Sequence, residues 1–98
     1  MTDYGATAGN SVAPSYGKDP SDVIDIPMSW QQLGTDAIIE SSWTSEGLTV
    51  GTAAWAGLNT WCFVSGGTAG SVYNLTNTIT TGMGRTLQRT VYIAVSEL

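Results

Sequence analysis

The sequence contains no histidine, a single cysteine and only three basic residues among its 98 positions. Without histidine, imidazole acid–base catalysis, a Ser-His-Asp triad and most zinc sites are excluded. One cysteine excludes an internal disulfide and therefore a small disulfide-stapled scaffold. Three basic residues cannot form the clustered positive surface that nucleic-acid binding requires. No apolar run is as long as a membrane span, and the first residues lack the pattern of a signal peptide. We therefore expect a soluble protein of a reducing cytoplasm that binds neither nucleic acid nor membrane.

The rest of the sequence has the pattern of a β protein. Apolar and polar residues alternate with a period of two in several short segments after residue 22, and Gly-rich turns separate these segments. The expected strands are residues 23–30, 36–44, 48–50, 60–64, 73–80 and 86–95. Residues 51–59 are interpreted as irregular, and no segment has a convincing helical period.

Six or seven antiparallel strands with one apolar face each predict an immunoglobulin-like β-sandwich, with a small closed barrel as the alternative. Trp43 and Trp61 are the expected aromatic anchors of the core, and Ile39 is expected on the same face as Trp43. Tyr73 follows the SGGTAG loop at the start of the penultimate strand, which is the position of a tyrosine corner.

Residues 1–21 (MTDYGATAGNSVAPSYGKDPS) are rich in Gly, Ala, Ser and Pro and show no periodic pattern. We expect them to form an extended N-terminal arm that lies on a partner, with the sandwich domain in residues 22–98. Tyr4 and Tyr16 fall in this arm, and Trp55 and Met83 fall in predicted loops. Because aromatic residues and Met are enriched in interfaces, these four residues are the predicted partner-binding residues.

The few reactive side chains do not form a catalytic or metal-binding pattern. Cys62 lies mid-strand in an apolar run, as a small buried hydrophobe does. Asp36 and Glu40 have polar neighbours and are interpreted as solvated rather than as a glycosidase pair. The three aspartates in residues 19–25 lack the Gly-punctuated loop of a calcium site. SGGTAG lacks the GK[ST] ending of a phosphate loop. The sequence therefore predicts no enzyme, no metal site and no cofactor.

Three blocks of sequence resemble a known family. They are KDPSDVIDIPMSW at residues 18–30, LGTDAIIESSWTSEGLTV at 33–50, and WCFVSGGTAGSVYNLTNTITTGMGRTLQRTVYIAV at 61–95. Together they resemble the small Ig-like virion proteins of tailed bacteriophages in the phage fiber-tail adaptor family. The resemblance covers about four-fifths of the chain and leaves out residues 1–17.

The resemblance implies a non-enzymatic structural adaptor in the virion, assembled in the host bacterial cytoplasm. Its partners would be other virion proteins of the tail, neck, capsid or fiber, and further copies of itself in a symmetric assembly. A capsid decoration or head-fiber protein is the alternative, and it would be present in far more copies per particle. A third hypothesis, from another class, is a carbohydrate-binding module that presents Trp55 to a host glycan.

Overall fold

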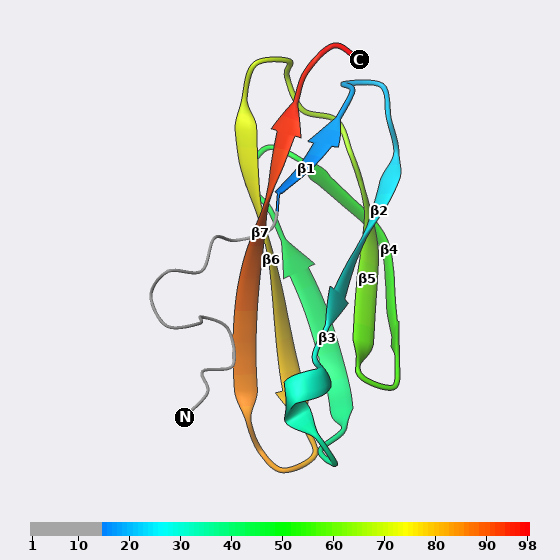
Figure 1. Ribbon diagram of the computed structural model, residues 1–98, viewed down its shortest axis with the longest axis vertical. Coiled ribbons are helices and arrows are strands. Elements are labelled where there is room, and N and C mark those ends of the chain that lie inside the picture. The colour runs from blue at the N-terminus through cyan, green and yellow to red at the C-terminus, as the bar shows by residue number, and fades with distance from the viewer. Residues whose placement is uncertain (1–14) are drawn as a thin grey trace.

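The structure is a computed structural model that describes residues 15–98 (Figure 1). Seven strands and one short 3-10 helix follow one another along this part of the chain. They are β1 (Ser15–Lys18), β2 (Ile24–Ser29), η1 (Gln31–Leu33), β3 (Ile38–Thr44), β4 (Thr49–Ala56), β5 (Asn59–Ser65), β6 (Val72–Thr81) and β7 (Thr86–Val95). No helix in the described residues has both the length and the hydropathy needed to cross a membrane.

The strands form two sheets that enclose the core. One sheet has the order β1-β7-β6-β3, and the other has the order β2-β5-β4. In Figure 1, β6 and β7 lie on the left and β4 and β5 on the right. Neighbouring strands are antiparallel except for β1, which runs parallel to β7. The predicted all-β, Ig-like sandwich is confirmed, and since no strand pairing joins the two sheets within residues 15–98, the closed barrel is wrong.

The largest fully buried side chain of the core is that of Trp30, which follows β2 and has no exposed surface. The alternation predicted for β6 and β7 is confirmed, because Leu75, Ile79, Val91 and Ile93 all point inward and are buried. Burial of one such side chain contributes about 1.5–3 kcal/mol to stability. This single apolar layer holds the two sheets together.

Of the two predicted aromatic anchors of the core, one is confirmed and the other is wrong. Trp43 is buried in the core, as expected. The inward placement of Trp61 is wrong, because Cys62 and Val64 are the β5 residues that point into the core. Residues on both faces of β5 are apolar, so the period of two did not identify which face is buried.

The predicted arm is too long at its C-terminal end. Ser15–Lys18 forms β1 and is paired with residues 92–95 of β7, so these residues belong to the sandwich. Tyr16 packs against the core and Lys18 is fully buried. The strand was missed because SYGK does not alternate and ends in a charged residue. Residues 1–14 lie outside the described part of the chain.

Two further predictions about strands are corrected. A register shift between Ile38 and Glu40 turns Ile38 inward and leaves Ile39 58% exposed, so the predicted inward position of Ile39 is wrong. Residues 51–59 are not irregular, because β4 continues to Ala56 and pairs with β5. Its small Gly and Ala residues give little alternation, and tertiary pairing overrides their low β propensity.

The predicted tyrosine corner is confirmed. The hydroxyl oxygen of Tyr73 accepts a hydrogen bond of 2.8 Å from the backbone N–H of Thr68, five residues upstream. This bond fastens the loop between β5 and β6 to the start of β6. The loop is therefore held to the sandwich by a side chain.

Candidate interaction surface

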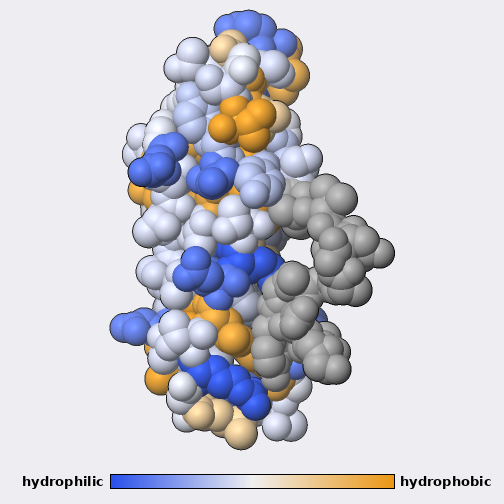
Figure 2. Space-filling model, turned by 90° about the vertical axis from the view of Figure 1, so that its left-hand side faces the viewer, coloured by the Kyte–Doolittle hydropathy of each residue, from blue (hydrophilic) through white to orange (hydrophobic). Residues whose placement is uncertain are grey.

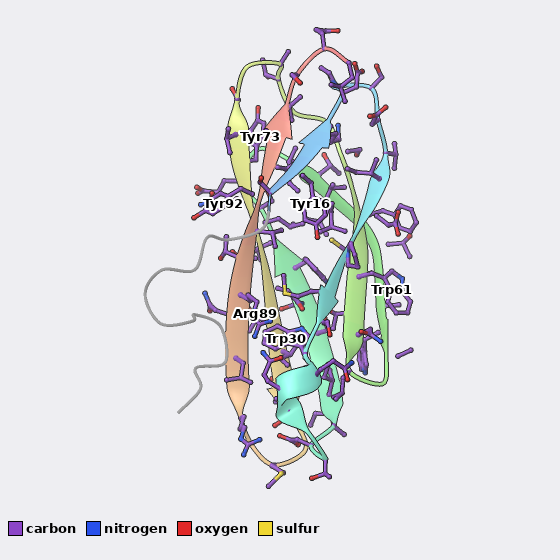
Figure 3. The ribbon with its side chains drawn as sticks, viewed as in Figure 1. Tyr16, Trp30, Trp61, Tyr73, Arg89 and Tyr92 are labelled. Atoms are coloured by element: carbon purple, nitrogen blue, oxygen red, sulfur yellow. The ribbon has the colours of Figure 1, made fainter. Side chains whose placement is uncertain are left out.

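The outer face of the three-stranded sheet carries a row of apolar side chains. Trp61 of β5 is paired directly with Pro27 of β2 and with Ala54 of β4. Directly paired residues share one face of a sheet, so these side chains form a strip across all three strands. Phe63 lies on the same face two residues further along β5 and is 38% exposed. We call Pro27, Ala54, Trp61 and Phe63 the aromatic face; Figure 3 shows Trp61 directed away from the sandwich.

β4 has a bulge beside Phe63. The register of β4 against β5 shifts between Val50 and Ala53, which places Gly51 beside Phe63. A Cβ at Gly51 would lie 3.7 Å from the Cβ of Phe63 and 3.5 Å from its carbonyl oxygen. These are ordinary contact distances, and because glycine has no side chain, residue 51 places no atoms beyond its backbone beside Phe63.

The aromatic face has one charged neighbour. Asp25 is paired with Phe63 across β2 and β5 and is exposed on the same side of the sheet. No other residue in β2, β4 or β5 carries a charge. The surface is therefore an apolar strip with a single carboxylate at its rim, a composition that suits a protein interface.

The outer face of the four-stranded sheet is different in character. It presents mainly hydroxyl and amide side chains from β6 and β7, namely Asn74, Thr76, Thr78, Thr80, Thr86, Gln88 and Thr90. Tyr92 is its exposed aromatic residue. Figure 2, seen from the β6 and β7 side, shows a surface that is mostly white and blue with separate orange areas. Of the two sheet faces, the aromatic face is the one suited to docking.

A second group of apolar side chains lies where β3 begins. Trp55 of β4 is 40% exposed and its Nε1 donates a hydrogen bond of 3.2 Å to the carbonyl oxygen of Ile38. The backbone N–H of Gly82, in the turn between β6 and β7, donates to the carbonyl oxygen of Ala37 at 2.9 Å. These bonds join β4 and the β6–β7 turn to the same point of the chain. We call Trp55, Ile39 and the 67% exposed Met83 the end patch.

Asp36 holds the turn that presents Met83. Its carboxylate accepts hydrogen bonds from the backbone N–H of Met83 at 3.1 Å and of Ala37 at 2.8 Å, and it forms a salt bridge of 3.1 Å with Arg85. Asp36 is 6% exposed, so it is not the solvated carboxylate that the sequence suggested. The turn is therefore fixed before any partner binds.

A buried polar network supports the sheets from inside. Asn77 accepts hydrogen bonds through its Oδ1 from Trp30 Nε1 at 3.0 Å and from the Thr60 hydroxyl at 2.7 Å, and its Nδ2 donates to the carbonyl oxygen of Ser42 at 2.9 Å. The guanidinium of Arg89 stacks 4.5 Å from the centre of the Trp30 ring. Figure 3 shows Arg89 and Trp30 together between the sheets. The network links β2, β3, β5 and β6 across the core.

The thiol and the two aspartates that could serve in catalysis or metal binding are buried or hydrogen-bonded within the fold. Burial raises the pKa of the Cys62 thiol to about 12, so it is not a nucleophile at neutral pH. Asp19 accepts hydrogen bonds from Ser21 and from the N–H of Leu98, and Asp22 accepts one from the N–H of Asp19. In the part of the chain that the structure describes, no three metal-ligating side chains lie together.

The predicted partner-binding residues are distributed over the molecule. Trp55 and Met83 belong to the end patch, although Trp55 lies in a strand rather than in a loop. Tyr16 is half-buried in β1, so it is not an arm residue. Tyr4 lies outside the described residues. A role of any of the four in binding stays a prediction.

The aromatic face was not among the surfaces predicted from the sequence. The alternation in β5 contained the signal, since residues 61 and 63 must share one face, but that face was assigned to the core. Pro27 was a second signal, because a proline within a strand indicates an edge strand; its pairing with Trp61 became evident only in the structure.

The model of the family described as "Podophage GP4 fiber-tail adaptor protein gp77" matches residues 18–94. The chain belongs to this family of fiber-tail adaptors. The match begins at the buried Lys18 and ends at Ala94 in β7, and so spans nearly the whole sandwich. The suspected family resemblance is confirmed, and the family supports a virion structural protein.

A solved structure supports the fold of this adaptor family member. The chain is similar to the solution structure of the PKD domain from KIAA 1837 protein, with a TM-score of 0.59 and 19% identity over 94% of this chain and 93% of that chain. At this identity the likeness shows the fold alone, an Ig-like sandwich. A search of the curated proteins found no match.

Proposed function

We propose that this chain is a non-enzymatic adaptor that joins a fiber to the tail or neck of a phage particle. The aromatic face and the end patch serve as two separate contact surfaces. An adaptor needs two such surfaces, because it must hold two partners at once. One surface lies on the face of the three-stranded sheet and the other at the end where β3 begins.

The observation that carries the proposal is the contrast between the two sheet faces. The outer face of the four-stranded sheet presents mainly threonine, asparagine and glutamine side chains, with Val72 and Tyr92 exposed among them. On the three-stranded sheet, the middle strand instead places the half-buried Trp61 and the 38% exposed Phe63 on the outer face. Large aromatic side chains at the centre of a contact carry most of the binding energy in many interfaces.

We further propose that the chain functions in several copies and that Tyr4, in the arm, contacts a neighbouring subunit. The arm ends before Ser15, since β1 is part of the sandwich. Binding of nucleic acid, membrane or a cofactor is not part of the proposal. The distribution of charge supports this. Among the three basic residues, Lys18 is buried and Arg85 pairs with Asp36.

The test compares two exposed aromatic residues on opposite sheets. Phe63 and Tyr92 are each 38% exposed, so substitution by serine removes a similar exposed ring from each outer face. We expect Phe63→Ser to reduce incorporation into particles at least about tenfold, which corresponds to about 1.4 kcal/mol of binding free energy. Tyr92→Ser is expected to be incorporated normally.

Both variants are first compared with the wild type by thermal unfolding, so that a folding defect is not read as a binding defect. Equal incorporation of the two folded variants would contradict the role of the aromatic face. A cryo-EM map of whole particles then decides the position. A few copies at the tail or neck support the adaptor, whereas hundreds of copies on the shell would make it a decoration protein.

A further inference from the structure

An open pocket lies on the outer side of the four-stranded sheet, where β3 ends. Its volume is about 390 Å³, and it is lined by Thr44, Ser45, Glu46, Val72, Asn74 and Thr76. Tyr73 also lines it and lies, in Figure 3, at the end of the sandwich opposite the β6–β7 turn. The pocket is therefore separate from both the end patch and the aromatic face.

The pocket exists because β3 leaves β6 before it reaches the start of that strand. The last pair between them joins Thr44 to Thr76, and residues 45–48 belong to no strand. β6 itself begins at Val72 and is paired with β7 from there. Residues 72–75 therefore have an edge that no strand within residues 15–98 covers. Such an edge offers backbone hydrogen-bonding groups to a further strand.

The hydrogen bonds at the two ends of β6 show which groups face this edge. The N–H of Thr81 donates to the carbonyl oxygen of Arg85, and the carbonyl oxygen of Ser71 accepts from the N–H of Val95. These directions alternate along an antiparallel strand, and β6 pairs with β7 without a register shift. Odd-numbered residues of β6 thus bond to β7, and the N–H and C=O groups of Asn74 point toward the pocket. Within residues 15–98 neither group has a backbone partner.

The side chains around these backbone groups are mainly hydrogen-bond acceptors. Among the described residues that line the pocket, Glu46 alone is charged, and it is exposed. The hydroxyl oxygen of Ser45 is buried and has no hydrogen-bond partner in the part of the chain that the structure describes. A carboxylate only accepts hydrogen bonds, and amide and hydroxyl oxygens accept them as well. This set suits a cation with many donors, and the planar guanidinium of arginine presents five.

The turn that carries Glu46 is fixed before any ligand binds. Gly47 has a φ of 105° and lies so close to the ring of Tyr73 that an added Cβ would overlap it. The Tyr73 hydroxyl in turn accepts the hydrogen bond of 2.8 Å from the N–H of Thr68. A wall that is already formed lowers the entropy cost of binding.

We propose that this pocket binds an extended segment of a partner protein that carries an arginine side chain. The segment adds a short antiparallel strand to β6 beyond the end of β3, and one of its residues exchanges N–H and C=O hydrogen bonds with Asn74. The side chain of that residue lies on the outer face beside Asn74, and its guanidinium pairs with the carboxylate of Glu46. Main-chain bonds supply affinity, and the charge pair supplies the preference for arginine. The site does not depend on the adaptor role.

The test uses the full-length chain, isotope-labelled for NMR, and the capped peptide acetyl-Thr-Arg-Thr-amide. Its control peptide contains citrulline in place of arginine, which keeps the shape of the side chain and removes its charge. We expect the arginine peptide to shift the amide signals of Glu46, Asn74 and Thr76 and to slow hydrogen exchange at Asn74. It should bind about threefold more tightly than the citrulline peptide, the size expected for an exposed ion pair.

Two carboxylate variants identify the group that recognises the charge. Glu46→Gln should remove the preference for arginine over citrulline. Glu40→Gln is the matched control and should keep that preference, because Glu40 is exposed in β3 but does not line the pocket. Added salt should weaken the preference in the wild type, since ions screen an exposed pair.

Three results with the peptides would overturn the proposal: no shift of the pocket amides, equal binding of the two peptides, or binding that leaves hydrogen exchange at Asn74 unchanged. N-acetylglucosamine tests the other class of ligand that a polar pocket could take. If this sugar shifts the same amides equally in the wild type and in Glu46→Gln, and the arginine peptide does not shift them, the pocket is a sugar site.

Discussion

The ammonium group of Lys18 donates a hydrogen bond of 2.6 Å to the carbonyl oxygen of Gly66, 48 residues away in the sequence. The same group donates to the carbonyl oxygens of Asp19 at 2.9 Å and Pro20 at 3.4 Å. A fully buried lysine thus joins β1 to the SGGTAG loop. The contact explains how a lysine can be fully buried in the sandwich, since three backbone carbonyl oxygens accept hydrogen bonds from its three N–H groups.

We expect Lys18→Met to lower the free energy of unfolding by about 1–3 kcal/mol, because methionine keeps the buried stem but leaves the carbonyl oxygens without a donor. Urea unfolding followed by tryptophan fluorescence measures the change. Thr86→Ala, at an exposed position in β7, is the control and should change stability by less than about 0.5 kcal/mol. A stability of Lys18→Met equal to that of the control would show that the contact is dispensable.

The Asp36 carboxylate makes stability depend on pH. Burial by itself raises the pKa of this group, but hydrogen bonds from the Thr81 hydroxyl and the N–H groups of Ala37 and Met83, together with the charge of Arg85, lower it below the ordinary value of 3.8. A carboxyl whose pKa is lower in the folded state stabilises the fold above its unfolded pKa. This contribution is lost as the pH falls through the folded pKa.

We therefore expect Asp36→Asn to be less stable than the wild type at neutral pH and the difference to shrink below about pH 4. Melting temperatures of both proteins across this range measure the effect. Comparing the two at each pH removes the contribution of other carboxylates, such as Asp19, whose pKa is also lowered. A difference that stays constant down to low pH would contradict the assignment.

Asn77 is the centre of the buried network, so its loss removes hydrogen bonds from several groups at once. We expect Asn77→Ala to cost about 2–4 kcal/mol, since Trp30 Nε1 keeps only its longer bond of 3.3 Å to Thr60 and the carbonyl oxygen of Ser42 loses the bond from Asn77. Asn74→Ala, at an exposed position in the same strand, provides the control. Chemical denaturation of both variants checks the prediction, and equal losses would show that the network adds little.

Gly47 lies against the ring of Tyr73, and Gly57, which has no such neighbour, provides the comparison. Both have positive φ angles, of 105° and 59°, but only at Gly47 would an added Cβ overlap the ring of Tyr73. We expect Gly57→Ala to cost about 1 kcal/mol from the backbone alone, and Gly47→Ala to cost clearly more. Faster amide exchange at Thr68 in Gly47→Ala would show that the Tyr73 bond has broken; equal costs would refute the packing argument.

The sequence predicted the strands best where only one face is apolar. In β6, Leu75 and Ile79 alternate with threonines, so both the strand and its buried face were evident. In β5 both faces are apolar, and which one is buried depends on the sheet that packs against it. β1 has four residues without alternation, and its place in the sheet is set by pairing with a strand at the other end of the chain.

The interaction surface was harder to predict for the same reason. Isolated aromatic and methionine residues in presumed loops pointed to Trp55 and Met83, which are hydrogen-bonded to Ile38 and Asp36 at the start of β3. The aromatic face arises from three strands that are separate in the sequence and meet only in the sheet. Neither composition nor spacing contains the pairing of Trp61 with Pro27 and Ala54.

The parallel pairing of β1 with β7 has a mechanical consequence. A pulling force applied between the start of β1 and the end of β7 acts along both strands, in opposite directions. Their hydrogen bonds lie across the force and are loaded together, whereas those of an antiparallel hairpin pulled at its two ends would open one after another. A chain tethered through these two strands would therefore resist stretching in shear, a useful property where a fiber transmits strain to a particle.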